Sequence, residues 1–274
     1  MNLRELKVAT DQFALSEKMP VLFIGHGHPM NALLDNNFTR TLQQIGQTLP
    51  KPNAVLMISA HWQTKGTYVS TNAHPRAIYD FGRFDDRLFE MKYEPPGHPQ
   101  MAKELIKSVT YTKVLEDNNM GLDHGAWTVL QYIYPKADVP VFEMSIDYTQ
   151  PTAFHYQLGH ALRQLREKGV LIISSGNIVH NLYAADFYNM DAKPFEWAIA
   201  FDEVVKEKIN AGDHQSLIDY HKMGLAASYA VPTNDHYLPM MYTLGLLDKA
   251  EAVKHLFEGY QNASVSMRCF SSVK

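Results

Sequence analysis

Residues 19–30 read MPVLFIGHGHPM, and this stretch decides the fold class because a short apolar run passes directly into a loop of glycine and histidine. Two further runs end in a similar way: residues 54–59 precede Ala60-His61-Trp62, and residues 170–174 precede Ser175-Gly176-Asn177. Short, continuous apolar runs are typical of strands that are buried on both faces of a sheet. We therefore expect central strands that each deliver polar side chains at their ends.

Amphipathic patterns of helical period lie between and after these runs. We predict helices over residues 37–49, 99–108, 126–134, 151–168 and 194–211. The alternation of strands and helices predicts an α/β fold with a central, largely parallel or mixed sheet and helices on both faces. Because ligands bind at the carboxyl ends of the strands in such sheets, a metal site is expected at that edge.

The composition narrows the class of protein. The 274 residues include 25 Lys or Arg and 29 Asp or Glu, and no basic block, which argues against a nucleic-acid partner. Neither a secretory signal nor an apolar stretch of membrane-span length is visible, so we expect a cytoplasmic protein with no membrane partner. No repeat or linker divides the chain, which favours a single domain over residues 1–274. The oligomeric state cannot be read from these patterns.

Cysteine and histidine usage limits the kind of metal site. The single cysteine, Cys269, excludes a thiolate zinc cluster, so a metal would need imidazole and carboxylate ligands. Imidazole binds Fe(II) or Zn(II), and a catalytic site needs about three protein ligands with open positions for substrate. Five histidines stand in motifs that suit such a site: His26, His61, His124, His180 and His236.

Each of these histidines also has a simpler interpretation. A loop histidine such as His26 more often forms hydrogen bonds than binds metal, although its two flanking glycines favour a crowded site. His61 fits a core histidine equally well, and His124 fits a residue at a helix terminus. We expect the remaining histidines apart from His28 to lie in polar loops or on exposed helix faces and assign them no role: His74, His98, His155, His160, His214, His221 and His255.

Taken together and in order, the motifs are familiar. They are Gly25-His26-Gly27, Ser59-Ala60-His61-Trp62, Asp123-His124-Gly125, residues 175–182 and His236-Tyr237-Leu238-Pro239. This combination resembles the class III extradiol ring-cleavage dioxygenases, and it is most similar to the 4,5-DOPA extradiol dioxygenase branch from about residue 19 to residue 270. The resemblance implies a non-haem Fe(II) enzyme that opens the ring of an L-DOPA-like catechol by 4,5-cleavage, inserting both atoms of O2.

The resemblance also implies a role for each motif histidine. The implied metal ligands are His26, His61, His180 and His236. The implied acid/base residues are His124 and His180, because a neutral imidazole can accept a catechol proton and return it. His28 and Asp235 are further candidates for the metal shell. Fe(II) is expected for activity, and Zn(II) is a second candidate for the metal of the purified protein.

Two other functions stay open at this point. A zinc-dependent hydrolase would use the same histidines, because a site with one open position also activates water. A non-catalytic metal-binding protein would result if His28 closed the coordination sphere. For the enzyme, we expect flat pocket walls from Trp62, Phe81, Trp127 and Tyr237, and we expect the loop over residues 71–96 to set substrate choice.

Overall fold

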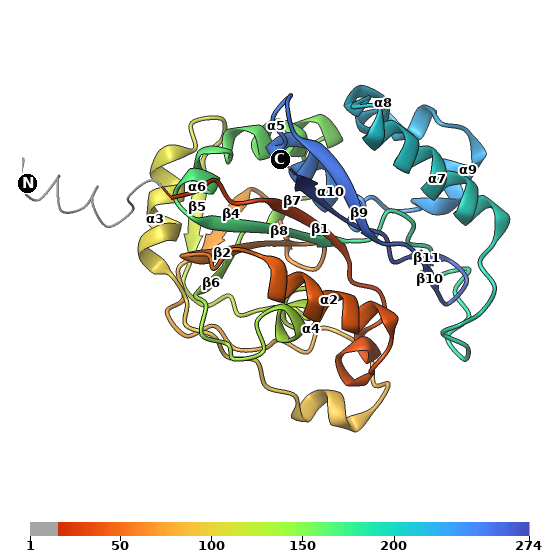
Figure 1. The fold of residues 1–274 in the computed structure, drawn as a ribbon, viewed down its shortest axis with the longest axis horizontal. Helices are drawn as coiled ribbons and strands as arrows, with labels where there is room; N and C mark the ends of the chain where they lie inside the picture. Colours follow the sequence, from red (N-terminus) through yellow and green to blue (C-terminus); the bar gives the residue numbers. More distant parts are fainter. Residues whose placement is uncertain (1–15, 274) are drawn as a thin grey trace, which may run out of the picture.

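The computed structural model describes residues 16–273 and is built around a six-stranded sheet (Figure 1). Its order is β6-β2-β8-β1-β12-β9. The strands are β1 (Val21–Gly25), β2 (Ala54–Ser59), β6 (Val141–Glu143), β8 (Val170–Gly176), β9 (Ala252–Phe257) and β12 (Cys269–Val273). Strands β6, β2, β8 and β1 run parallel to one another, whereas β12 pairs antiparallel with β1 and β9 pairs antiparallel with β12. The predicted α/β class with a mixed sheet is confirmed.

Both faces of the sheet are buried, which explains why its strands read as continuous apolar runs. In β1, Val21 and Phe23 pack into one core cluster, and the alternate residues Leu22 and Ile24 pack into the other. All four side chains are fully buried. Burying one such side chain contributes about 1.5–3 kcal/mol, so a polar residue at any of these positions would be costly.

Helices cover the two faces in pairs. α2 (Asn37–Thr48) and α4 (His124–Ile133) lie on one face, and α5 (Thr152–Ala161) and α10 (Leu238–Leu246) lie on the other (Figure 1). None of the described helices is both long enough and apolar enough to span a membrane.

Smaller elements surround this core. The remaining helices are α3 (Pro99–Ser108), α6 (Gln164–Glu167), α7 (Glu196–Asn210), α8 (His214–Ile218), α9 (Leu225–Ala230) and the 3-10 turns η1 (Pro29–Leu33), η2 (Asp86–Glu90) and η3 (Tyr220–Lys222). The remaining strands pair as β3 (Gln63–Thr64) with β7 (Ile146–Asp147), β4 (Thr67–Ser70) with β5 (Val114–Asp117) and β10 (Tyr260–Gln261) with β11 (Val265–Ser266). The α7, α8 and α9 helices lie together at one end of the molecule (Figure 1).

Two helix predictions need correction. The helix expected over residues 126–134 begins earlier, at His124, because the Asp123 carboxylate accepts a hydrogen bond from the Ala126 N–H at 3.1 Å and caps it there. The helix expected over residues 151–168 is divided into α5 and α6. At the division the Leu162 N–H is shared between the carbonyls of Leu158 and Gly159, which tightens the last turn of α5.

One histidine was wrongly placed by its sequence pattern. His155 was expected on an exposed helix face, but it is fully buried on α5. Its Nδ1 lies 2.9 Å from the Tyr242 hydroxyl of α10, so the polar atom is satisfied inside the helix pair.

Candidate metal centre and active site

The fold brings three distant segments to one edge of the sheet. His26 directly follows β1 and His61 closely follows β2, and these strands flank β8 in the sheet. The His26 N–H donates to the carbonyl of Gly176 at the end of β8, at 3.2 Å. The carbonyl of His236 accepts from the Asn177 N–H at 2.8 Å, which ties the segment before α10 to the same point. The carboxyl ends of the strands therefore hold all three histidines together.

Two glycines make this close approach possible. Gly27 has φ +63°, in the left-handed region that favours glycine, and this turn lets the chain leave β1 immediately after His26. A Cβ at Gly176 would lie only 2.3 Å from the backbone oxygen of His236. A larger residue there would push the His236 segment away from the sheet.

The imidazoles of His26, His61 and His236 point their Nε2 atoms at a common centre. Nε2 of His61 lies 3.1 Å from Nε2 of His26 and 3.3 Å from Nε2 of His236. Imidazole nitrogens about 2.1 Å from one ion are about 3.0–3.4 Å apart in octahedral or tetrahedral geometry. The measured spacings fall in that range, so these residues fit a shared divalent cation.

The opposite ring nitrogens explain why three Nε2 lone pairs face one another. The Ser175 hydroxyl donates its single proton to the Gly125 carbonyl at 2.7 Å, so it must accept from His26 Nδ1–H at 3.0 Å. Nδ1 of His236 contacts the Asp235 carboxylate, and Nδ1 of His61 lies 3.3 Å from Oδ2 of Asp80. Each acceptor favours a proton on Nδ1 and leaves Nε2 free, as in metal-bound histidines.

Burial keeps these three imidazoles neutral at neutral pH. Desolvation, reinforced by repulsion from the neighbouring imidazoles, holds the pKa of His26 and of His236 well below the ordinary histidine value. Burial, followed by repulsion from His124, lowers the pKa of His61 to about 3. Because only the neutral ring can donate a lone pair to a metal, all three are in a ligating form at pH 7.

Two further imidazoles stand beside this group. His124 is the first residue of α4, and its ring centroid lies 3.9 Å from that of His61. His180 stacks on His236 with a centroid distance of 3.5 Å and an interplanar angle of 8°. His180 forms a second group of close ligand atoms with Asp235 and His236, rather than with His26 and His61. Burial lowers the pKa of His180 to about 4, so it is also neutral at pH 7.

Asp80 was not identified from the sequence, although it contacts two of the five imidazoles. Its Oδ1 accepts from the His124 backbone N–H at 2.9 Å, and its Oδ2 lies 3.1 Å from His124 Nδ1. The only signal was an acidic residue in Asp80-Phe81-Gly82, which reads as a turn within the long loop over residues 71–96.

A cavity of about 200 Å³ opens onto the five imidazoles. Its apolar wall consists of Pro29, Phe81, Phe84, Leu182, Phe187 and Val265. Of the predicted wall residues, Phe81 alone belongs to this lining. Trp62 is buried away from it, and Trp127 and Tyr237 are fully buried core residues that donate hydrogen bonds to the carbonyls of Ile78 and Leu217, each at 3.0 Å. These three wall predictions are wrong.

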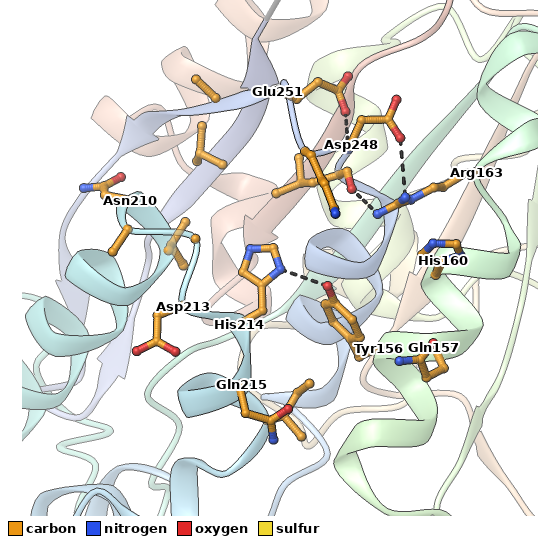
Figure 2. A pocket seen from close by; sticks show the side chains of 18 residues that line it. Tyr156, Gln157, His160, Arg163, Asn210, Asp213, His214, Gln215, Asp248 and Glu251 are labelled. Carbon is orange, nitrogen blue, oxygen red and sulfur yellow. Dashed lines mark hydrogen bonds and ion pairs between the residues drawn. The ribbon is translucent and has the colours of Figure 1, made fainter.

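A larger cavity, of about 820 Å³, lies between α5, α8 and the start of β9, and Figure 2 shows the side chains that line it. Two contacts join polar groups of its lining: the Tyr156 hydroxyl lies 3.1 Å from His214 Nδ1, and Nη1 of Arg163 lies 3.5 Å from Oδ1 of Asp248. Within residues 16–273 its side chains form no group that could share a metal ion. Volume alone therefore does not identify the reactive site, which is the smaller cavity.

The smaller site can hold a cation, exchange protons and accept a flat ring. Three facing imidazoles supply the cation ligands, and His124 and His180 are positioned for proton transfer. The phenylalanine wall suits a planar apolar ring.

Comparisons with known proteins give matches along nearly the whole chain. The family model described as "Catalytic LigB subunit of aromatic ring-opening dioxygenase" matches residues 19–269. The "4,5-DOPA dioxygenase extradiol" of Escherichia coli (strain K12) is 40% identical over 258 residues, covering 92% of this chain and 94% of that protein. A protein of the same name from Beta vulgaris is 33% identical, covering 86% of this chain and 91% of that protein. The crystal structure of an uncharacterized Escherichia coli K12 protein superposes with a TM-score of 0.81 and 37% identity, covering 92% of this chain and 99% of that one.

Proposed function

Because the chain belongs to the family of the catalytic LigB subunit of aromatic ring-opening dioxygenases and is an extradiol ring-opening dioxygenase, we propose that it uses Fe(II) and O2 to open a catechol beside the diol. The observation that carries the proposal is the convergence of the Nε2 atoms of His26, His61 and His236 beside two further imidazoles. The relatives named 4,5-DOPA dioxygenase support a catechol cleaved in the 4,5 position. The family match argues against a zinc hydrolase and a non-catalytic protein.

His26, His61 and His236 would hold the metal, and their three ligand atoms leave the remaining positions to substrates. When bound, Fe(II) supplies the Lewis acidity and redox chemistry that a catechol and O2 require to react. The same nitrogen ligands also bind Zn(II) tightly, so Zn(II) is expected in protein purified without added iron. All the proposed ligands lie at the edge of one sheet, so we treat the whole chain as a single catalytic domain.

His124 and His180 would move the protons. A catechol loses hydroxyl protons when it binds as a dianion or monoanion, and ring opening requires that a proton be returned. His180 enters the reaction neutral because burial lowers its pKa to about 4, so it can accept a proton. Asp80 fixes His124 through the backbone bond at 2.9 Å and the contact at Nδ1, which holds the ring toward the cavity. The phenylalanine wall supplies an apolar surface for the ring beside these groups.

The proposal is tested by anaerobic reconstitution with Fe(II), followed by addition of a catechol and air-saturated buffer. We expect a yellow ring-fission product and consumption of one O2 for each catechol. His236→Ala should abolish both signals, whereas His221→Ala, at an exposed position, should not. Product formation that does not consume O2, or equal rates with Zn(II) and Fe(II), would refute the proposal.

The proton-transfer role is tested separately with His180→Ala. We expect kcat to fall by about 10²–10⁴-fold, the usual contribution of general acid–base catalysis, while Fe(II) still binds. Near-native turnover of the iron-loaded variant at saturating substrate would show that His180 does not transfer protons.

A further inference from the structure

His26 is the one proposed ligand with a glycine on either side, so its neighbours in the sequence leave its backbone the most freedom. The ring is held by Ser175 at Nδ1, and the backbone N–H donates to the carbonyl of Gly176 at 3.2 Å. Both contacts lie on the strand side of the ligand. Beyond it the chain turns at Gly27, so the turn keeps its shape only if other groups hold it from the far side.

Two buried amide side chains hold the far side of this turn. They are Asn31 of η1, which is 2% exposed, and Gln261 of β10, which is 7% exposed. Nδ2 of Asn31 donates to the carbonyl of His26 at 3.2 Å, and the backbone N–H of His28 donates to Oε1 of Gln261 at 3.0 Å. The amides also bond to each other, from Asn31 Nδ2 to Gln261 Oε1 at 3.0 Å and from Gln261 Nε2 to Asn31 Oδ1 at 2.8 Å.

The backbone partners fix which way each amide is turned. A carbonyl can only accept, so the atom of Asn31 that faces the carbonyl of His26 must be its NH2 group. A backbone N–H can only donate, so the atom of Gln261 that faces His28 must be its oxygen. With these two orientations set, both contacts between the amides join a donor to an acceptor. The pair is therefore complementary to itself and to the turn.

The turn is also packed directly against the hairpin formed by β10 and β11. A Cβ at Gly27 would lie 2.5 Å from Oε1 of Gln261 and 2.2 Å from Sδ of Met267, which is itself buried. Asn31 and Gln261 are 230 positions apart in the sequence. The conformation of the His26 turn is thus set by a distant segment of the chain and not by local sequence.

From this arrangement we propose that Asn31 and Gln261 are positioning residues for the metal centre, because they hold the His26 turn in the shape that presents Nε2 to the ion. The proposal rests on the proposed metal-binding role of His26. Neither amide belongs to the described lining of the small cavity, so both act through His26. A turn that is ordered before the ion arrives spares metal binding the loss of conformational freedom.

Asn31→Leu and Gln261→Met test the proposal. Both replacements are similar in size to the native side chains, and neither adds a charge near the ion. Each single variant should weaken Zn(II) binding at pH 7 by about 3- to 10-fold in chelator competition, the contribution of one hydrogen bond. Because each single variant already removes the contacts between the amides, the loss in the double variant should be smaller than the product of the two single losses.

Asn262→Gly is the matched control, because Asn262 follows Gln261 on the same hairpin but does not contact the His26 turn. Its side chain donates to the carbonyl of Asp186 at 2.8 Å, and its φ of +53° is one that glycine adopts freely. We expect its Zn(II) affinity to stay within about twofold of wild type. The visible absorption of the Co(II)-loaded protein reports ligand geometry, and it should change in Asn31→Leu but not in Asn262→Gly.

Urea unfolding identifies which variants are folded, and the folded ones among the two single variants and the double variant decide the outcome. Wild-type Zn(II) affinity and an unchanged Co(II) spectrum in them would overturn the positioning role. An equal loss of affinity in Asn262→Gly would also overturn it, because the effect would then be a general loosening of the hairpin. If His26→Ala binds Zn(II) as tightly as wild type, the metal centre of the proposed function fails, and the role of the two amides falls with it.

Discussion

Asp80→Asn should weaken metal binding although Asp80 is not among the three facing ligands. The carboxylate accepts from the His124 backbone N–H at 2.9 Å and lies 3.3 Å from His61 Nδ1 and 3.1 Å from His124 Nδ1. Burial favours its protonated form, but hydrogen bonding from His124 holds the pKa of Asp80 below its ordinary value. The ionised group thus favours a proton on Nδ1 of His61 and a free lone pair on Nε2.

The size of the effect follows from these contacts. Removing the outer partner of a ligating histidine costs about 10- to 100-fold in metal affinity, or about 1.4–2.7 kcal/mol. An asparagine has one acceptor and one NH2 donor, so whichever way its amide is turned, a donor faces an N–H of His61 or His124. We therefore expect the loss of metal affinity in Asp80→Asn to lie at the upper end of this range. The loss in Asp80→Ala should lie at the lower end, because alanine removes the acceptor without adding a donor.

The assay is competition for Zn(II) with a chromophoric chelator at pH 7. Asp86→Asn is the matched control, because Asp86 lies in the same loop but is exposed and pairs with Arg83 at 2.7 Å on the surface. Its Kd should stay within about twofold of wild type. Wild-type affinity in Asp80→Asn, or an equal loss in the control, would refute the reasoning.

Two further predictions concern a ligand partner and a buried ion pair. Ser175→Ala removes the acceptor of His26 Nδ1 and should weaken Zn(II) binding by about tenfold. The control is Ser174→Ala, because the buried Ser174 hydroxyl has no partner in the described chain, and this variant should bind Zn(II) like wild type. Chelator competition that finds equal losses of affinity in the two variants would contradict this prediction. Glu251→Gln should lower the free energy of unfolding at pH 7 by about 3 kcal/mol, because Arg166, 2.8 Å away and buried, loses its charge partner. Burial acts to raise the pKa of Glu251, but Arg166 holds it at about 2, below the ordinary 4.5. This stabilisation is complete above about pH 4.5 and is lost as the pH falls toward 2. In urea unfolding, the difference in free energy of unfolding between wild type and Glu251→Gln should therefore shrink between pH 7 and pH 3. A difference that stays constant over this range would contradict the role given to the Glu251–Arg166 pair.

The strand ends could be predicted because the apolar run of each strand and the parallel arrangement of the sheet lead to the same positions. Each buried strand has its own apolar run, and parallel strands align their carboxyl ends, so His26 and His61 could be placed at one edge without knowing the strand order. The antiparallel addition of β12 and β9 was not predicted, because their sequences, CFSSV and AVKHLF, are not continuous apolar runs like those of the central strands.

Side-chain direction was not predictable where tertiary packing decides it. Trp127 lies one turn after His124 on α4, and Tyr237 directly follows His236, but both rings are fully buried in the core, where packing against other elements directs them. His155 is buried because α5 packs on α10, a pairing that the pattern of α5 alone does not show. Asp80 reaches His124 across 44 positions on an irregular loop, so no periodicity could connect them.

The central claim is that one ion is shared by three imidazoles, and a crystal structure of the anaerobically prepared Fe(II) protein tests it directly. We predict an ion bonded to the Nε2 atoms of His26, His61 and His236 at about 2.0–2.2 Å, with Nδ1 of each ring still on its present partner. An ion bound elsewhere, or one that engages fewer than these three nitrogens, would contradict the account.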